Sequence, residues 1–533
     1  MKLGTYLRAE GFSVREFAKS VNVTEAAMSR YVSGKRLPRP EIMQRIVEAS
    51  GGGVQPNDFF ERDIPPTPVE IRPAPAVTKA LDTADETARF LACHPDVRWV
   101  DTLIPDLNGI PRGKRLDVSG LAKAFKTGLR LPGSTYAMNV MGENVDSTGM
   151  GPPDGDPDYP CYAVPGTLAP VPWVGPEQAQ VLLTMVNDAE APWWLDPRVV
   201  VRRMADRIAE LGLKPVVAIE LEFYLIEPET GEFGVPRLAA APGTGLRPRE
   251  TQVFLMDDLD AFAPVLNDII DMCRAQHLPA DVATIEYAPG QFEINLKHVD
   301  DPVTACDHAF LMKRAIKGVA RRYGMVATFM ARPFRKLSTS GTHIHLSLLD
   351  KDGRNIFDDG GLAGTAKLRH AVGGLTATMA EGMAIWAPNA NSFRRINPHG
   401  WVPLAPTWGY NNRTVAIRIP SGETAARRLE HRAAGADANP YLVMAGVLAG
   451  VHHGLVNAID PGPAITGNAP EQVPASLPAI WVDALRAFDE AKVLPDYLGT
   501  DYCDMYSKIR WSEFLEFNDH ISALEYDRFL RMI

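Results

Sequence analysis

Short amphipathic segments separated by turn residues make up the first 50 residues, and this pattern predicts a bundle of short helices. Ser13, with Glu16 three residues later, is typical of a helix N-terminus, and Thr24 begins the next segment in the same way. Pro40 opens a third predicted helix, which Gly51 ends. A helix, a short turn and a second helix form a helix-turn-helix unit. Its buried side would carry the spaced apolar residues Ala18, Val23, Met28 and Val32.

The outer face of the second predicted helix carries Glu25, Ala26, Ser29 and Arg30. The stretch REFAKSVNVTEAAMSRYVSGKRLPRPEIMQRIVEAS resembles the lambda-repressor and Cro type of helix-turn-helix domain, and GKRLPRPE is its most specific part. That resemblance implies that the outer face enters the major groove of DNA. The alternative is a small helical bundle that mediates protein contacts and never meets DNA.

Composition divides the rest of the chain into three parts. After a head of residues 1–60, residues 61–84 include the run ERDIPPTPVEIRPAPAVT, whose five prolines and lack of periodicity predict an extended linker. Residues 85–190 contain short strand-like runs and many turns, and apolar alternation on both sides of the Asn-Gly pair at 108–109 is typical of a hairpin. From 191 to 533 strands alternate with helices.

The overall composition is that of a globular protein. The chain has 533 residues, of which 46% are hydrophobic and 23% charged. No stretch approaches the ~20 consecutive apolar residues of a membrane span. The first residues, MKLGTYLRAEGFSVREF, lack the apolar core of a signal peptide, so we expect a cytoplasmic protein without membrane contact. Five cysteines without CxxC spacing argue against a disulfide framework and a structural zinc site.

Charge is distributed unevenly between the head and the body. Residues 1–50 carry nine Lys and Arg against five Asp and Glu, a net charge of +4. The remainder carries 46 against 60, a net charge of −14. An acidic body repels DNA, whereas a small basic head could bind it. We therefore expect two functions on one chain.

Acids and histidines recur at alternating positions of predicted strands in the second half. After a helix predicted over Arg202–Gly212, KPVVAIELEFYLIEP is typical of a strand that carries Glu220 and Glu222 on one face. A single such pair usually faces solvent, but the recurrence of the pattern favours a shared site. Its further members are Glu286 and Glu293, His343 and His345, and the group Arg428, Glu430 and Arg432.

Carboxylates and imidazoles from separate strands suit two hard divalent cations such as Mg²⁺ or Mn²⁺. Arg395, Arg413 and Arg418 add groups that suit phosphate and carboxylate oxygens. Acids that hold metals, together with arginines that hold anions, are the equipment for phosphoryl transfer from a nucleotide. The chain has no Walker-type GxxxxGK[ST] motif, so it is not expected to be a P-loop enzyme.

Over about residues 95–533 the chain resembles the glutamine synthetase superfamily. Six segments occur in the order and spacing of that superfamily: ELEFYL, APGQFEIN, GTHIHLSL, NSFRRINP, WGYNNRTVAIRIP and RRLEHRAAGADANPYLVMAGVLAG. With the all-α head, the resemblance implies an α+β chain. Residues 85–190 would form a β-grasp domain, and 191–533 a catalytic domain with a curved antiparallel sheet backed by helices. It also implies a homo-oligomeric ring, usually two stacked hexamers (a dodecamer), with active sites between neighbouring subunits.

The resemblance implies a role for each matching residue. Glu222, Glu286 and Glu293 match the ligands of a first metal ion, and Glu220, His343 and Glu430 those of a second. Arg395 and Arg432 match positions that bind glutamate, Arg413, Arg418 and Arg428 those around the ATP phosphates, and His345 with Ser347 the nucleotide side. Arg395 and Arg413 are the catalytic candidates. The implied chemistry is attack of a carboxylate on the γ-phosphate of ATP, followed by displacement of phosphate by an amine.

Three positions depart from the ammonia-using members. Trp401 stands where those members carry a glutamate that shields the acyl phosphate and helps to deprotonate ammonium. Asn139 stands where an ammonium-binding acid is expected, and Thr339 where the family usually has glycine at the amino-acid pocket. Losing both acids removes the site that attracts ammonium, and Trp401 offers an apolar or cation–π wall for a larger amine.

The segments DLNGIPRGKRLD, VPGTLAP and WGYNNRT resemble the γ-glutamylpolyamine synthetase branch more than housekeeping glutamine synthetase. The hypothesis is therefore a glutamate–amine ligase that uses ATP, glutamate and a polyamine, monoamine or ethanolamine-like acceptor. One alternative is an ammonia-dependent glutamine synthetase. Another is a DNA-binding transcription regulator whose body senses a ligand without turnover, although every implied metal-ligand position is filled.

Overall fold

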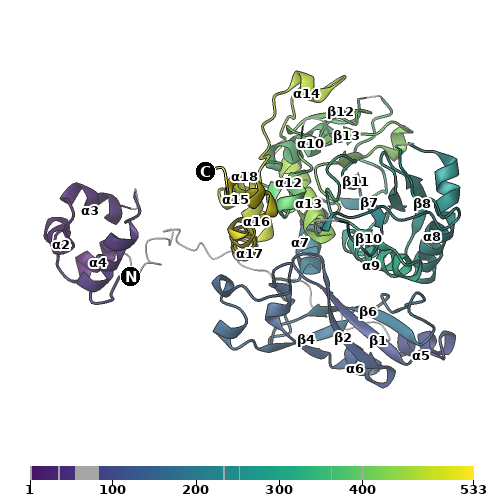
Figure 1. The fold of residues 1–533 in the computed structure, drawn as a ribbon, viewed down its shortest axis with the longest axis horizontal. Coiled ribbons are helices and arrows are strands. Elements are labelled where there is room, and N and C mark those ends of the chain that lie inside the picture. The colour runs from purple at the N-terminus through teal and green to yellow at the C-terminus, as the bar shows by residue number, and fades with distance from the viewer. Residues whose placement is uncertain are drawn as a thin grey trace. The chain divides into compact units, whose positions relative to one another are not determined.

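The computed structural model describes residues 3–33, 36–54, 83–231, 234–250, 253–361, 363–397 and 401–533. The chain forms two compact units, Met1–Arg72 and Pro73–Ile533 (Figure 1). The predicted linker of residues 61–84 lies outside the described residues except for its last two positions, which begin helix α5 (Thr83–Cys93). None of the described helices combines the length and apolar character needed to cross a bilayer.

The described part of the head consists of the helices α1 (Leu3–Ala9), α2 (Val14–Ser20), α3 (Glu25–Val32) and α4 (Pro40–Ala49). The predicted start of α2 is confirmed, because the backbone N–H of Glu16 donates to Ser13 Oγ at 3.2 Å and the Glu16 carboxylate accepts from the Ser13 backbone at 3.0 Å. Asn22, with φ of 55°, turns the chain between α2 and α3. Phe17 and Met28 belong to the small core that the helices share.

Helix α3 begins as predicted, since the Ala27 backbone N–H donates to the Thr24 side chain at 3.2 Å. Its buried side includes Met28, which has no exposed surface. The predicted outer-face residues are all exposed: Glu25, Ala26, Ser29 and Arg30. Within the described part of the head this face is exposed, and its contact with DNA stays a prediction.

A mixed sheet follows α5 in the second unit. Its elements are β1 (Trp99–Pro105), β2 (Pro111–Asp117), α6 (Leu121–Lys126), β3 (Leu129–Pro132), β4 (Asp158–Ala163), β5 (Ala169–Pro170) and β6 (Gln178–Met185). The strand order is β2-β1-β6-β4-β3, with β5 also paired to β6. The predicted hairpin is confirmed: β1 and β2 are antiparallel, and Gly109 in their loop has φ of 72°.

The remainder of the unit is an antiparallel-rich sheet with helices packed against it. Its strands are β7 (Lys214–Ile226), β8 (Ala280–Ile285), β9 (Gln291–Leu296), β10 (Val326–Thr328), β11 (Thr342–Leu349), β12 (Trp408–Tyr410), β13 (Ile417–Ile419) and β14 (Leu429–His431). The order is β12-β13-β14-β11-β7-β9-β8, and β10 pairs with β7. This arrangement places the predicted acid-bearing strands β7, β9, β11 and β14 beside one another.

Helices cover one face of this sheet and extend beyond it (Figure 1). They are α7 (Pro197–Glu210), α8 (Met256–Ala275), α9 (Pro302–Arg322), α10 (Ala366–Thr378), α11 (Met383–Trp386), α12 (Ala390–Phe393), α13 (Pro440–Asn457), α14 (Ala469–Gln472), α15 (Trp481–Asp489), α16 (Leu494–Leu498), α17 (Thr500–Asp519) and α18 (Ala523–Phe529). The helix predicted over Arg202–Gly212 is α7, and it begins earlier because Asp196 caps it by accepting from the Arg198 N–H at 2.9 Å.

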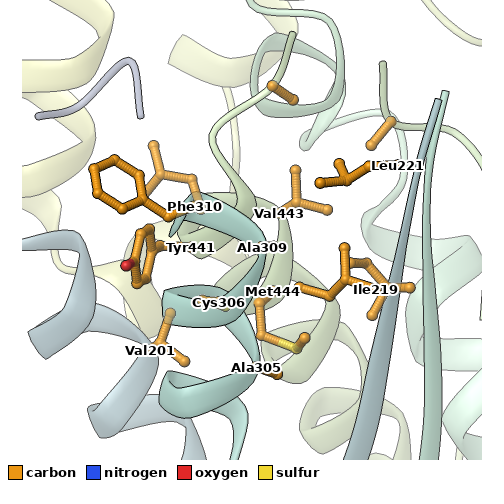
Figure 2. Close-up of a cluster of buried hydrophobic side chains, with 14 of the residues drawn as sticks. Val201, Ile219, Leu221, Ala305, Cys306, Ala309, Phe310, Tyr441, Val443 and Met444 are labelled. Atoms are coloured by element: carbon orange, nitrogen blue, oxygen red, sulfur yellow. The ribbon is translucent and has the colours of Figure 1, made fainter. Parts of the chain in front are cut away.

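Strand β7 separates an apolar face from a polar one. Ile219 and Leu221 have no exposed surface and point toward α9 and α13 (Figure 2). Cys306 of α9 and Met444 of α13 belong to the same core. Because successive side chains of a strand point to opposite faces, the residues between and beside these apolar ones point away from the helices. The core thus fixes which face of β7 carries the acids.

Candidate active site

The register of the sheet brings the acids of β7 together with groups from its two neighbours. Glu220 lies opposite His343 of β11, and Glu222 lies opposite Glu293 of β9. Directly opposite residues of an antiparallel pair have Cβ atoms about 4.5–5.5 Å apart, so their side chains interact. Acids that are far apart in the sequence therefore converge on one face.

One group of possible ligand atoms contains Glu220, His343 and Glu430, whose donor atoms all lie within 4.8 Å of one another. His343 Nδ1 is 3.2 Å from Glu220 Oε2 and 4.0 Å from Glu430 Oε1. His345 Nε2 is 2.9 Å from Glu220 Oε1. Burial acts to raise the pKa of Glu220, but the hydrogen bonds of His343 and His345 outweigh it and lower the pKa. This is the set that the resemblance assigns to the second metal ion.

A second group contains Glu222, Glu293 and His343. Burial and three neighbouring carboxylates, of which Glu220 contributes most, raise the pKa of Glu293 to about 9. Burial and Glu222 raise the pKa of Glu286 to about 7. Glu286 follows β8 directly and lies outside the tight donor group, although the resemblance assigns it to the first metal ion. Burial and mutual repulsion thus dominate the surroundings of these two carboxylates, and Arg413 offsets only part of the effect on Glu286.

The donor set fits hard divalent cations. Among the described residues it consists of carboxylate oxygens and one shared imidazole, without a cysteine thiolate. A cation among the acids would remove the repulsion that raises the pKa values of Glu286 and Glu293. Metal binding would also release the protons that those raised pKa values retain.

Arginines surround the same acids. Arg418 Nη1 donates to Glu430 Oε2 at 2.9 Å, and Arg432 donates to the other oxygen of Glu430. Although burial opposes the effect, Arg432 contributes most among the groups that lower the pKa of Glu430 to about 2. Arg428 Nε is 3.2 Å from His345 Nδ1. The structure thus brings three predicted anion-binding arginines, Arg418, Arg428 and Arg432, close to the predicted metal ligands.

The two catalytic candidates differ in their surroundings. Arg395 is buried, and its guanidinium donates to the Ala433 carbonyl at 2.7 Å. Burial lowers the pKa of Arg395 to about 10, and the charges of Glu222 and Asp437 offset this effect only in part. Arg413 is exposed, and its charge acts on Glu286 by lowering that pKa. Arg395 is therefore fixed in place by the backbone, whereas Arg413 is open to solvent.

Two of the predicted residues, Ser347 and Asn139, form hydrogen bonds with groups outside the acid cluster, and a third, Trp401, is exposed. The Ser347 hydroxyl donates to the Arg427 carbonyl at 2.9 Å. Trp401 is 61% exposed, and residues 398–400 before it lie outside the described part of the chain. Asn139 Nδ2 donates to Glu143 Oε2 at 3.0 Å. Trp401 is therefore largely exposed, and a ligand could cover its indole ring.

Gln291 is a site residue that motif reasoning missed. It is 1% exposed, and its amide donates to Glu222 Oε2 at 3.3 Å and to the Thr339 carbonyl at 3.0 Å. The Gly341 N–H donates to the same Glu222 oxygen at 2.8 Å. Glu222 Oε1, in contrast, faces His343 at 3.9 Å. Gln291 and Gly341 thus hold one carboxylate oxygen and leave the other for a cation.

Strand alternation contains the signal for this residue. Gln291, Glu293 and Asn295 occupy every second position of β9, and Asn295 Nδ2 donates to Glu220 Oε1 at 3.0 Å. Strand alternation places Glu220 and Glu222 on one face of β7, and it likewise places Gln291 and Asn295 on the same face of β9 as Glu293. Applying it to β9 would have identified both amides.

Gln291→Leu is expected to weaken Mn²⁺ binding 10–100-fold, about the usual effect of losing a hydrogen bond to a metal ligand. Isothermal titration with Mn²⁺ measures it without requiring turnover. The control is Gln276→Leu, which removes another buried amide, one that donates to the Pro170 carbonyl at 2.7 Å. Equal Mn²⁺ affinity in the two variants would show that Gln291 does not position Glu222.

Comparison with known proteins connects this geometry to a family. Residues 194–529 match the model of the glutamine synthetase catalytic domain. The chain is 42% identical to gamma-glutamylputrescine synthetase PuuA of Escherichia coli (strain K12), covering 84% of this chain and 94% of the relative. It is 30% identical to glutamate–isopropylamine ligase of a Pseudomonas species, covering 80% and 94%.

A solved structure gives the same result for the fold. The structure of a GmaS/ADP complex superposes with a TM-score of 0.73 at 27% sequence identity, covering 83% of this chain and 99% of that one. The match to the family model begins at residue 194, after the head and the smaller sheet. The family model, the relatives and the superposition agree on the unit that carries the acid cluster. The chain belongs to the glutamine synthetase family.

Proposed function

We propose that the chain is an ATP-dependent ligase that joins the γ-carboxylate of glutamate to an organic amine through an acyl phosphate. The observation that carries the proposal is the cluster of acids, histidines and arginines on β7, β9, β11 and β14. Two similar proteins are named for joining glutamate to putrescine or to isopropylamine, which supports an organic amine as the acceptor.

Residues of this chain would bind the metal ions and the two substrates ATP and glutamate. Glu222, Glu286 and Glu293 would hold one Mg²⁺ or Mn²⁺ ion, and Glu220, His343 and Glu430 a second. Such ions, when bound, offset the negative charge of the ATP phosphates. Arg413, Arg418 and Arg428, with His345 and Ser347, would orient the nucleotide, whereas Arg395 and Arg432 would bind glutamate. An oxygen of the γ-carboxylate of glutamate attacks the γ-phosphorus of ATP. The bond between that phosphorus and the departing ADP breaks.

The amine then attacks the acyl carbon of the γ-glutamyl phosphate. The carbon–oxygen bond to phosphate breaks, and the amine loses a proton as the amide forms. Trp401 would cover the hydrocarbon part of the acceptor, since its indole is exposed and carries no charge. This is the feature that favours a larger amine over ammonium.

We assign the six-stranded sheet to a β-grasp domain and the head to the helix-turn-helix class. The proposal also includes assembly into a homo-oligomeric ring, a dodecamer, in which neighbouring subunits complete each site. Phosphate release by the purified protein with ATP, Mg²⁺, glutamate and a panel of amines tests the activity. Absence of release with every amine and with ammonium would favour a body that senses a ligand without turnover.

DNA binding by the head is a second proposed function. The exposed face of α3 supports it, as does the net charge of +4 over residues 1–50. A ring would link several heads, and linked heads bind more tightly than a single one because the later contacts become intramolecular.

Arg30→Ala in the full-length protein is expected to weaken binding to genomic fragments of the host several-fold at low salt. The affinity of the unsubstituted protein should fall steeply with added salt, because phosphate contacts release counterions. Electrophoretic mobility shift measures both effects. Arg45→Ala is the control, since the Arg45 guanidinium is bound to the Glu41 carbonyl of α4 at 3.2 Å. No DNA retention at low salt would leave only the protein-contact alternative for the head.

A further inference from the structure

Helix α9 carries a stripe of cations that lines a space shared with residues of the smaller sheet, such as Asp101 and Arg115. Lys313, Lys317 and Arg321 follow one another at intervals of four residues, so they lie on one face of the helix. Like charges at this spacing repel each other and destabilise the helix. Favourable interaction with the helix C-terminus accounts for Arg321 but not for Lys313 or Lys317, which lie more than one turn earlier.

These three side chains line two adjoining cavities. One has a volume of about 460 Å³ and extends along β10 to Asp437, and the other has about 270 Å³ and extends to Trp173. Gly109 and Ile110 of the β1–β2 loop lie in both linings. We call the combined space the α9 cleft. It is large enough for a small molecule with several charged groups.

Part of the charge around the α9 cleft is already compensated. Arg115 Nε is 2.7 Å from Asp101 Oδ1, and Arg314 Nη2 is 2.6 Å from Asp101 Oδ2. Asp437, the other acid in the lining, accepts from Asn389 at 2.9 Å and from Ser392 at 2.7 Å through one oxygen. Asp101 is therefore committed to two arginines, whereas the second oxygen of Asp437 is buried without a hydrogen-bond partner and the charge of Asp437 acts on Lys313.

Lys317 and Arg321 have no acidic partner within 4.0 Å among the residues that the structure describes. Burial, and then the nearby Arg321, lower the pKa of Lys317. Lys317 Nζ lies 5.6 Å from the centroid of the Phe329 ring, and Lys313 Nζ lies 5.3 Å from it. Because residues 51–533 carry a net charge of −14, a cleft in which Lys317 and Arg321 lack an acidic partner contrasts with the rest of this part of the chain.

The α9 cleft is connected to the catalytic residues through backbone. Lys313 Nζ donates to the carbonyls of Ala436 at 2.6 Å and Ala438 at 3.2 Å. In the same segment the Ala433 carbonyl accepts from Arg395. Lys313 therefore fixes the far end of the segment that holds a predicted glutamate-binding arginine.

We propose that the α9 cleft binds a small multivalent anion, with Lys317 and Arg321 as its principal contacts, at a site separate from the catalytic acids. The shared chemistry of the ligand is two or more phosphate or carboxylate groups on one small molecule. Paired cations bind such groups by charge-assisted hydrogen bonds. Through Lys313, the anion would stabilise the segment that positions Arg395. This site does not depend on the identity of the amine.

The test is isothermal titration of the full-length protein with tripolyphosphate in one arm and citrate in the other, without added metal. The paired variant Lys317→Ala/Arg321→Ala is expected to lose at least tenfold in affinity for the anion that binds. The matched control is Arg322→Ala, which removes a neighbouring cation of α9 that is 3.5 Å from Asp268 and lies outside the lining of the cleft. Binding in the tripolyphosphate arm alone identifies a phosphate ligand, and binding in the citrate arm alone identifies a carboxylate ligand.

Catalytic-site binding is separated by measuring ADP with Mg²⁺ in the same variants. Unchanged ADP affinity together with lost anion affinity supports the proposal. Absence of anion binding in both arms overturns it, as does equal anion affinity in the paired variant and the control. Thermal unfolding checks that the paired variant is folded, and Lys317→Gln provides a milder substitution that should also weaken anion binding.

Discussion

Replacing Glu430 is expected to abolish phosphate release, with a loss of at least 1,000-fold, or about 4 kcal/mol of transition-state stabilisation. Glu430 is 1% exposed and belongs to the donor group with Glu220 and His343. It also accepts from Arg418 and Arg432. Removing its charge would therefore weaken a divalent-cation site and release two arginines that surround it.

The form of the substitution matters because Glu430 is buried. Glu430→Ala leaves both arginines without their partner, and breaking a buried ion pair in this way costs about 3–5 kcal/mol of stability. Glu430→Gln keeps the shape and still accepts a hydrogen bond, so its effect on turnover is easier to separate from unfolding. Circular dichroism establishes that each variant is folded, and phosphate release with ATP, glutamate, amine and Mg²⁺ measures activity.

A second buried acid serves as the control. Asp307 is 5% exposed and lies 2.8 Å from Arg198 on the helical side of the body. Asp307→Asn breaks an ion pair of similar burial but should retain turnover wherever the protein is folded. Activity in EDTA, or near-normal turnover of folded Glu430→Gln, would reject Glu430 as a metal ligand.

Local sequence patterns predicted which strand face carries the acids, but not which strands meet. The two-residue spacing of Glu220 and Glu222 placed them on one face of β7, as the structure confirms. Their partners, His343 and Glu293, come from segments that are distant in sequence. Strand register depends on these long-range pairings, so spacing alone supports a site only as a hypothesis.

Helix boundaries show a related limit. The helix predicted over Arg202–Gly212 begins at Pro197, although an Asp-Pro pair is a recognisable start signal. Asp196 has no exposed surface and also accepts from Tyr136 at 3.1 Å and Thr184 at 2.7 Å. The Asp196 carboxylate thus caps α7 and also links α7 to the smaller sheet. No local sequence pattern indicates this second role.

The acceptor preference is the second large effect. At least one organic amine is expected to give kcat/KM tenfold or more above ammonium, equivalent to about 1.4 kcal/mol. An ammonium site must replace the hydration of a small cation, which requires carboxylates around it. Trp401 carries no charge, and the amide of Asn139 is bound to Glu143. Neither Trp401 nor Asn139 therefore provides a carboxylate that would compensate free ammonium for its lost hydration.

A larger amine can bind by its hydrocarbon part instead. Burial of apolar surface contributes ~25 cal/mol per Å², so covering ~100 Å² would supply roughly 2.5 kcal/mol. The 61% exposure of Trp401 leaves enough indole surface for such a contact. That gain exceeds the difference needed for tenfold preference. Steady-state rates with polyamines, alkylamines, ethanolamine, aromatic amines and ammonium measure the preference directly.

Trp401→Glu provides the reciprocal test. A carboxylate at this position should raise kcat/KM for ammonium and lower it for the preferred amine, because it attracts the small cation and removes the apolar wall. Trp99→Glu is the control, since Trp99 is also exposed, at 41%, but stands at the start of β1. If ammonium is the best acceptor of the unsubstituted protein, Trp401 does not select the amine. The acids and arginines of the sheet would then serve an ammonia-dependent glutamine synthetase, because their roles toward ATP and glutamate do not depend on the acceptor.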